Sequence, residues 1–124
     1  EEAHALIVAA LDRVLAPEGY HRKGATWSLV SALGKSAVHL QRNRYGWEVQ
    51  ILLRFVTPEG EAPDHPDWPG GDDITLARFF DTVADDPGTL AFLDVLADPA
   101  RLELAVEILR GQVLPWFEAL HQPR

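Results

Sequence analysis

Residues 25–57, ATWSLVSALGKSAVHLQRNRYGWEVQILLRFVT, decide the fold of this chain. Three runs in which apolar and polar residues alternate are separated by Gly34-Lys35 and by Tyr45-Gly46. Each pair is typical of a two-residue turn, because glycine reaches positive φ at low cost. The pattern predicts three strands that form an antiparallel meander, with helices and loops packed against it.

The second turn sets a register between the second and third strands. It places Leu40 opposite Ile51 and Gln41 opposite Gln50, and side chains that lie directly opposite share a face of the sheet. The first turn, placed independently, puts Trp27 opposite Arg42 and gives the same division into an apolar and a polar face. The predicted apolar face consists of Trp27, Leu29, Val38, Leu40, Trp47, Val49, Ile51, Leu53 and Phe55.

This register directs Arg42 toward the apolar face, between Trp27 and Val49. We expect the stem of Arg42 to be buried at the edge of the core, with its guanidinium stacked on Trp27 or Trp47. A buried receptor for an anion is the alternative interpretation.

The flanking sequences predict helices that cover the apolar face. In residues 2–16 apolar residues recur at helical spacing, and Pro17 and Gly19 end the pattern. Residues 100–120 show a second apolar stripe. We expect a kink or break in it at Pro115, because a proline ring clashes with the carbonyl four residues earlier.

Two shorter helices are expected between the sheet and the last helix. Asp72 or Asp73 is a suitable N-cap for a helix over residues 74–84. Asp86-Pro87 and Asp98-Pro99 each combine an N-cap with a proline in the first turn. The apolar residues of the helix that follows Asp86-Pro87 are Leu90, Leu93 and Leu96.

The chain is 124 residues long, which is sufficient for one domain with a real core. We therefore predict a single α+β domain over residues 1–124. Its antiparallel sheet has at least three strands (the meander 25–57) and is covered on one face by the N- and C-terminal helices. There is no cysteine, no signal-peptide pattern and no apolar run long enough to span a membrane, so we expect a cytoplasmic protein without membrane association.

The net charge of −8 is distributed unevenly along the chain. Residues 13–54 contain seven Lys or Arg and two acidic residues, whereas residues 55–124 contain four Arg and fourteen acidic residues. The sheet region is therefore basic and the C-terminal half acidic. An acidic protein is repelled by nucleic acid, so we expect no nucleic-acid partner.

The polar face of the sheet is the best candidate site, because a row of amides beside an imidazole and a carboxylate can bind a polar ligand by hydrogen bonds. The alternative is an ordinary solvated face, which antiparallel sheets often have. The candidate ligand- or partner-binding residues are His39, Gln41, Asn43, Glu48, Gln50 and Arg54.

No catalytic arrangement is evident on this face or elsewhere in the sequence. His39 and Glu48 are about four residues out of step, which places them over roughly 10 Å apart and argues against an acid–base pair. We find no nucleophile elbow and no phosphate-binding loop, and His121 near the C-terminus is expected to be solvated.

Two other segments offer charged groups. The loop 58–73 contains Asp64, His65 and three further aspartates, but their spacing matches no known metal pattern, so we expect neither metal nor cofactor. The segment 20–24, YHRKG, is interpreted as the connection from the first helix to the sheet. Its three basic residues could capture an anion, and Tyr20 is expected to fill the edge of the core.

Several short motifs occur in an order that resembles a bacterial family catalogued as domain of unknown function 4304. Residues 19–24, GYHRKG, resemble the family's "G-[FY]-x-[KR]-[KR]-G" junction, and Trp27 matches its aromatic residue in the first strand. Residues 40–42, LQR, resemble the end of its second strand, and residues 113–117, VLPWF, its terminal "L-P-W-[LF]" segment. The resemblance covers roughly residues 5–120, is weakest over 74–98, and implies an α+β fold but no activity or cofactor.

We favour a non-enzymatic binding or protein-interaction module that uses the polar sheet face to hold a protein or a small polar ligand. A small enzyme is the alternative, acting on a polar or anionic molecule in a cleft between that face and the loop 58–73. A third hypothesis is a homodimer that buries the polar face or the free sheet edge.

Overall fold

The structure, a computed structural model, describes residues 2–43, 46–63, 74–75 and 89–123. Its helical elements are α1 (Glu2–Leu15), the 3-10 turn η1 (Ala16–Glu18), α2 (Phe92–Ala97), α3 (Pro99–Ile108), the π-helical segment η3 (Leu109–Val113) and α4 (Leu114–Leu120). Its strands are β1 (His21–Lys23), β2 (Thr26–Ser31), β3 (Gly34–Arg42), β4 (Glu48–Val56), β5 (Ile74–Thr75) and β6 (Thr89–Ala91).

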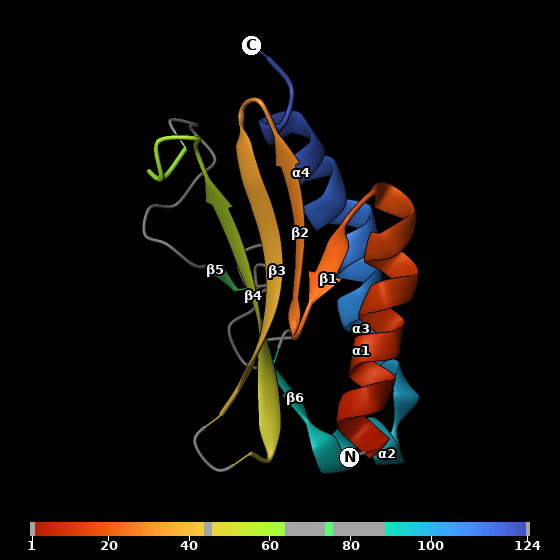
Figure 1. Cartoon of the computed structure of the whole chain (residues 1–124). Helices are drawn as coiled ribbons and strands as arrows, with labels where there is room; N and C mark the ends of the chain where they lie inside the picture. Colours follow the sequence, from red (N-terminus) through yellow and green to blue (C-terminus); the bar gives the residue numbers. More distant parts are fainter. Residues whose placement is uncertain (1, 44–45, 64–73, 76–88, 124) are drawn as a thin grey trace.

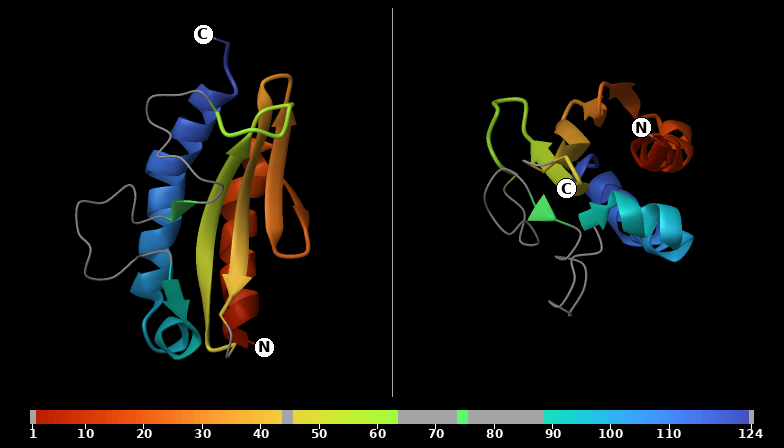
Figure 2. Two further views of the ribbon diagram at one scale, coloured as in Figure 1. Left: turned by 90° about the vertical axis from the view of Figure 1, so that its left-hand side faces the viewer. Right: turned by 90° about the horizontal axis from the view of Figure 1, so that it is seen from below.

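The strands form one antiparallel sheet in the order β1-β2-β3-β4, and both β5 and β6 pair with β4. Figure 1 looks onto the sheet with α3 and α4 behind it, and the turned views of Figure 2 show the sheet curling around the helices. The predicted α+β class is confirmed, with N- and C-terminal helices on one face of the sheet.

The predicted pairing of β3 with β4 is confirmed residue by residue. Leu40 lies opposite Ile51, and Gln41 lies opposite Gln50. At the turn between these strands Gly46 has a φ of +74°, which is the conformation for which glycine is preferred.

The predicted register between β2 and β3 is wrong. Trp27 lies opposite Val38 and not opposite Arg42, because the strands turn at residues 32–33, before Gly34. Gly34 is instead the first residue of β3, with a φ of +152°, and a Cβ there would lie 2.3 Å from the carbonyl oxygen of Val56. The glycine therefore permits close approach of two strands rather than forming the turn. The error is four residues, an even number, so the division into two faces is unchanged.

The segment 20–24 differs from the connection that we expected. Residues His21–Lys23 form β1, which pairs with β2 and adds a strand to the meander. Tyr20 is buried in the core, as predicted.

The core lies between the apolar sheet face and the helices, and it contains most of the residues predicted for that face. Trp47 is the exception, since it precedes β4 and its side chain is 73% exposed. Arg42 is also exposed, and its guanidinium carbon lies 5.5 Å from the ring centre of Phe92 rather than on Trp27 or Trp47.

Both long helical predictions are confirmed. The stripe of α1 is buried, and α1 ends where η1 and Gly19, with a φ of +91°, reverse the chain. The C-terminal helix is interrupted by the π-helical segment η3, which places Pro115 in the first turn of α4. The wider π-helical turn accommodates the proline ring that a regular α-helix would exclude. The Asp98 side chain caps α3 and accepts a hydrogen bond of 3.0 Å from the backbone N–H of Ala100.

The two shorter helices differ from their predictions. Residues Ile74–Thr75 form β5 opposite Leu52 and Leu53, so no helix begins at residue 74; residues 76–88 lie outside the described part. Leu90 belongs to β6 and is buried opposite Val49. The helix begins only at Phe92, because pairing with β4 holds the preceding residues extended.

Candidate functional site

A hollow of about 440 Å³ lies on the polar face of the sheet. Three of the six candidate residues, His39, Gln41 and Arg54, line it together. Sequence reasoning missed two further polar residues of this hollow, Thr26 and Lys35. The sequence pattern predicts Lys35 in a turn, whereas it lies in β3 on the same face as His39 and Gln41.

The register sets the distances across this hollow. Arg54 lies opposite Ala37, and Lys35 lies opposite Val56, so the two cationic residues are diagonal neighbours on adjacent strands. Diagonal neighbours are roughly 7–8 Å apart at their Cα atoms, which is within reach of two long side chains that hold one anion. His39 is oriented by Thr26, whose Oγ1 lies 2.7 Å from the imidazole Nδ1.

Strand β1 extends the basic character of this face. Lys23 pairs with Thr26 and His21 with Ser28, so both project from the polar face beside the hollow. Arg22 points the other way, with its Nε 3.4 Å from Asp12 Oδ1 on α1. In the sequence, only the order His-Arg-Lys could have predicted that His21 and Lys23 share a face. That order is informative only if these three residues are known to form a strand.

The polar face therefore carries Lys23, Lys35 and Arg54 together with two imidazoles, His21 and His39. Strands β1, β3 and β4 each contribute to this set. Adjacent strands are about 4.8 Å apart, so Lys23 and His39, two strands apart, are separated by roughly 10 Å. We call these five residues the basic face. Such a group can bind carboxylate or phosphate groups by charge-assisted hydrogen bonds.

The other three candidate residues do not line this hollow, although we expected them on the same face of the sheet. Asn43 has a structural role, because its Oδ1 accepts a hydrogen bond of 3.0 Å from the backbone N–H of Trp47 and thereby closes the β3–β4 turn. Asn43 and Glu48 both line a separate hollow at the end of the hairpin. Gln50 lies opposite Gln41 and is partly buried.

His39 and Glu48 are far apart, as predicted. His39 lies opposite Leu52 in the register, and Glu48 comes four residues before Leu52 on β4. At about 3.3 Å per residue this offset corresponds to roughly 13 Å along the strand, so the two side chains cannot share a proton directly.

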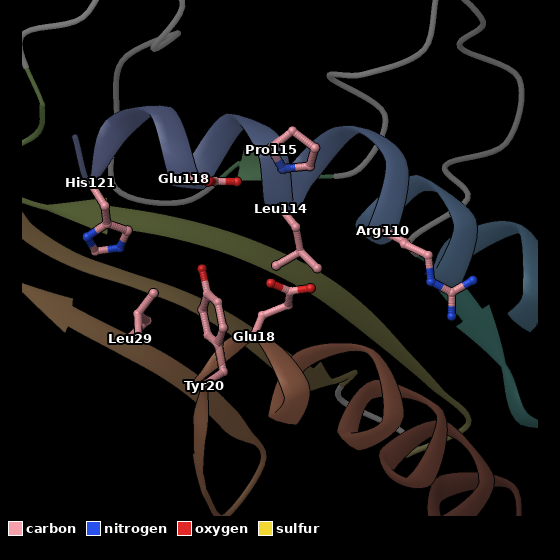
Figure 3. Close-up of a pocket in the computed structure, with 8 residues that line it drawn as sticks. All are labelled: Glu18, Tyr20, Leu29, Arg110, Leu114, Pro115, Glu118 and His121. Carbon is pink, nitrogen blue, oxygen red and sulfur yellow. The ribbon is translucent and has the colours of Figure 1, made fainter. Parts of the chain in front are cut away.

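A third hollow, a groove of about 320 Å³, lies on the helical side between η1 and α4. Figure 3 shows Tyr20 directed from the sheet toward α4, with Glu18 beside it and Leu114 above. The groove carries charges of both signs on partly apolar walls. It is lined by Glu18, Tyr20, Leu29, Arg110, Leu114, Pro115, Glu118 and His121.

A chain of hydrogen bonds lies at one end of this groove. The Tyr20 hydroxyl is 2.7 Å from Ser36 Oγ, and Ser36 Oγ is 2.8 Å from His121 Nε2. The other imidazole nitrogen, Nδ1, is 2.6 Å from Ser31 Oγ. The expectation that His121 is solvated is therefore wrong. Burial lowers its pKa, and its ring packs edge-on against Phe55 with ring centres 5.0 Å apart.

Burial limits the reactions that these hydrogen-bonded residues could catalyse. Ser36 is 0% exposed, so its hydroxyl cannot reach a substrate even though it contacts an imidazole. Burial is the main cause that raises the pKa of Tyr20 to about 12, so the phenol stays protonated well into the alkaline range. These residues hold α4 against the sheet and satisfy the polar groups at this end of the core.

Among the described residues no group of three His, Asp or Glu side chains is placed to hold a metal ion. The acidic part of the loop that we considered for metal binding, from Asp64 to Asp73, lies outside those residues. None of the described helices is long and apolar enough to cross a bilayer.

The fold and the basic face define the class of this chain as an α+β domain with a polar, cation-bearing sheet surface. Comparison with protein-family models, with curated proteins and with solved structures gives no match. The resemblance to the domain of unknown function 4304 family stays a prediction that rests on the motifs given above.

Proposed function

We propose that this chain is a non-enzymatic binding domain whose basic face binds an acidic surface of a partner protein. The observation that carries the proposal is the basic face itself, which occurs in a protein of net charge −8. Cationic side chains gathered on one face can orient an acidic partner during its approach, even when the net charge has the opposite sign. We further propose that it acts in the cytoplasm and has no nucleic-acid partner.

The geometry suits a surface contact. Lys35 and Arg54 can hold a carboxylate, while Thr26 fixes the imidazole of His39 and Gln41 offers both a donor and an acceptor. Lys23 on β1 lies two strands away from His39. A single small anion cannot contact both residues, whereas the surface of a partner protein can.

A pull-down from cell extract with the intact protein would identify the partner, and charge reversal would test the surface. We expect Lys35→Glu and Arg54→Glu each to weaken partner binding about tenfold, the equivalent of about 1.4 kcal/mol. Gln41→Ala should weaken binding without lowering thermal stability. Affinity should also fall as salt is added, because exposed charges are screened.

Arg13→Glu is the matched control. Arg13 is an exposed cation on α1, in the helical layer, and its reversal changes the net charge by the same amount. If Arg13→Glu weakens binding as strongly as Arg54→Glu does, only net charge matters and the basic face is not the site. If neither variant on the sheet changes binding, the proposal is also wrong.

A small enzyme is the second candidate, because a hollow of about 440 Å³ that contains His39 could hold a small polar or anionic molecule. In this function His39 is the candidate acid or base. Substrate turnover that is lost in His39→Gln, with folding intact, would support an enzyme; partner binding that is weakened by the same substitution, in a protein without turnover, would favour the binding domain.

A further inference from the structure

An exposed apolar patch lies at the end of the β3–β4 hairpin, on the hollow that Asn43 and Glu48 also line. Among the large apolar side chains of the described residues, Leu93 and Trp47 are the most exposed, at 80% and 73%. Both line one hollow of about 820 Å³. Isolated apolar residues are ordinary on protein surfaces, but two large ones on the same hollow indicate a contact surface.

The backbone holds this patch in a defined shape. The N–H of Phe92 donates a hydrogen bond of 2.9 Å to the carbonyl of Trp47, which ties the hairpin end to the start of α2. Pairing of Glu48 with Ala91 continues this connection into β6. The two apolar side chains therefore stand on fixed elements, which reduces the entropy lost when they are covered.

The charges around the patch are of both signs. Glu48 and Asp94 line the hollow, and the guanidinium of Arg42 lies beside it, over the ring of the lining residue Phe92. A two-fold contact places the same surface on both partners, so it requires a surface that is complementary to itself. A patch with an apolar centre, a cation and two carboxylates meets this requirement, whereas the basic face, which contains no carboxylate, does not.

We infer that this patch mediates two-fold association of two copies of the chain. Trp47 and Leu93 of each copy form the buried centre, and Arg42 of one copy faces Glu48 of the other at the rim. Figure 1 places the start of β4, β6 and α2 at one end of the molecule and α4 at the other, so two copies can meet there without obstructing the basic face. The association is independent of the proposed function.

Each copy carries a charge of −8, which opposes association, so we expect a weak dimer whose population rises with protein concentration. Sedimentation equilibrium of the full chain over a range of concentrations measures it directly. We expect the wild type to shift from monomer to dimer below about 1 mM and Leu93→Glu and Trp47→Ala to stay monomeric. A wild type that is monomeric up to about 1 mM overturns the inference.

Val30→Glu is the matched control, since Val30 is 71% exposed but lies on β2, away from the patch. It should dimerise as the wild type does. A dimer that survives Leu93→Glu uses another surface and overturns the inference. In a further test, Arg42→Glu should weaken the dimer at least fivefold, and Arg42→Glu combined with Glu48→Lys should restore it; a double variant no better than the single one contradicts the two-fold arrangement.

A second measurement guards against variants that fail to fold. In NMR spectra of the wild type, the indole N–H signal of Trp47, assigned with a Trp47→Phe variant, should shift or broaden with protein concentration. The signal of Trp27, which is fully buried, should not. Equal behaviour of both signals would contradict the inference.

Discussion

Ser36 Oγ lies 2.8 Å from His121 Nε2, and this contact joins two residues that are 85 positions apart in the chain. Ser36 also contacts the Tyr20 hydroxyl, and His121 also contacts Ser31. Strands β2 and β3, the start of β1 and the end of α4 thus meet through side-chain hydrogen bonds. Because Ser36 is fully buried, water has no access to its hydroxyl to replace a partner that is removed.

His121→Ala should destabilise the protein by about 1–3 kcal/mol, because it leaves Ser36 with one partner and removes a ring from beside Phe55. Chemical denaturation would measure the change in the free energy of unfolding. Gln122→Ala is the control, since Gln122 is the exposed neighbour of His121 and its truncation should cost less than about 0.5 kcal/mol. Equal effects of the two substitutions would show that the hydrogen bonds of His121 add no stability.

Stability should decrease in mild acid because of His121. Burial lowers its pKa in the folded state, so the unfolded chain takes up the proton first as the pH falls. The contribution is fully present above the unfolded pKa of about 6.5 and is lost as the pH falls through the lower folded pKa. Unfolding by urea at a series of pH values would measure this slope. His121→Gln should flatten the slope, and a slope identical to that of the wild type would refute the assignment to His121.

Tyr20 should give the opposite dependence in alkali. Its pKa is raised to about 12 in the folded protein, so the unfolded chain loses the phenol proton first, from about pH 10 upward. Stability is then lost as the pH rises through the folded pKa, by up to about 3 kcal/mol. Urea unfolding at increasing alkaline pH measures the loss. Tyr20→Phe, which keeps the ring, should remove this dependence, and persistence of the full slope would assign it to other groups.

The sequence predicts which residues share a face of the sheet more reliably than it predicts which residues pair across neighbouring strands. The β3–β4 register follows from Gly46, whose positive φ is used in the turn itself. The predicted β2–β3 register is wrong because Gly34 does not form the turn. Glycine is instead required there because β3 closely approaches Val56 of β4, a residue that is distant in sequence. Local turn preferences cannot reveal such a contact, whereas alternation still identifies which residues are buried.

The candidate site was predicted only in part for a related reason. His39, Gln41 and Arg54 could be placed together because alternation and one correct register suffice. Lys23 could not be placed with these residues, because a strand of three residues is too short for its alternation to be recognised in the sequence. His121 was missed because its partners Ser31 and Ser36 are distant in sequence and nothing local distinguishes it from a solvated terminal residue.

Gly34→Ala should destabilise the protein by roughly 1–3 kcal/mol or more. The φ of +152° is strained for alanine, and the added Cβ would lie 2.3 Å from the Val56 carbonyl oxygen, a backbone atom that cannot move without disturbing β4. Thermal and urea unfolding would measure the loss. Gly24→Ala is the control: its φ is +62°, but nothing lies within 4 Å of an added Cβ, so only backbone strain remains. Equal losses at both positions would show that the contact with Val56 relaxes.

Asp12 fixes α1 to the sheet by hydrogen bonding. Its Oδ1 accepts a hydrogen bond of 2.7 Å from the indole Nε1 of Trp27 and lies 3.4 Å from Arg22 Nε. Trp27 is fully buried, so removal of its acceptor leaves a buried donor unsatisfied. We expect Asp12→Ala to lower the free energy of unfolding by about 1–3 kcal/mol.

Two further variants separate the hydrogen bond of Asp12 from its charge. The ion pair with Arg22 is about 40–46% exposed on both sides, so Arg22→Ala should cost less than about 1 kcal/mol. Asp12→Asn keeps an oxygen that can accept from Trp27 and should therefore cost less than Asp12→Ala does. If Asp12→Asn and Asp12→Ala are equally damaging, the charge of Asp12 and not its bond to Trp27 holds α1 in place. Urea unfolding of all three variants distinguishes these outcomes.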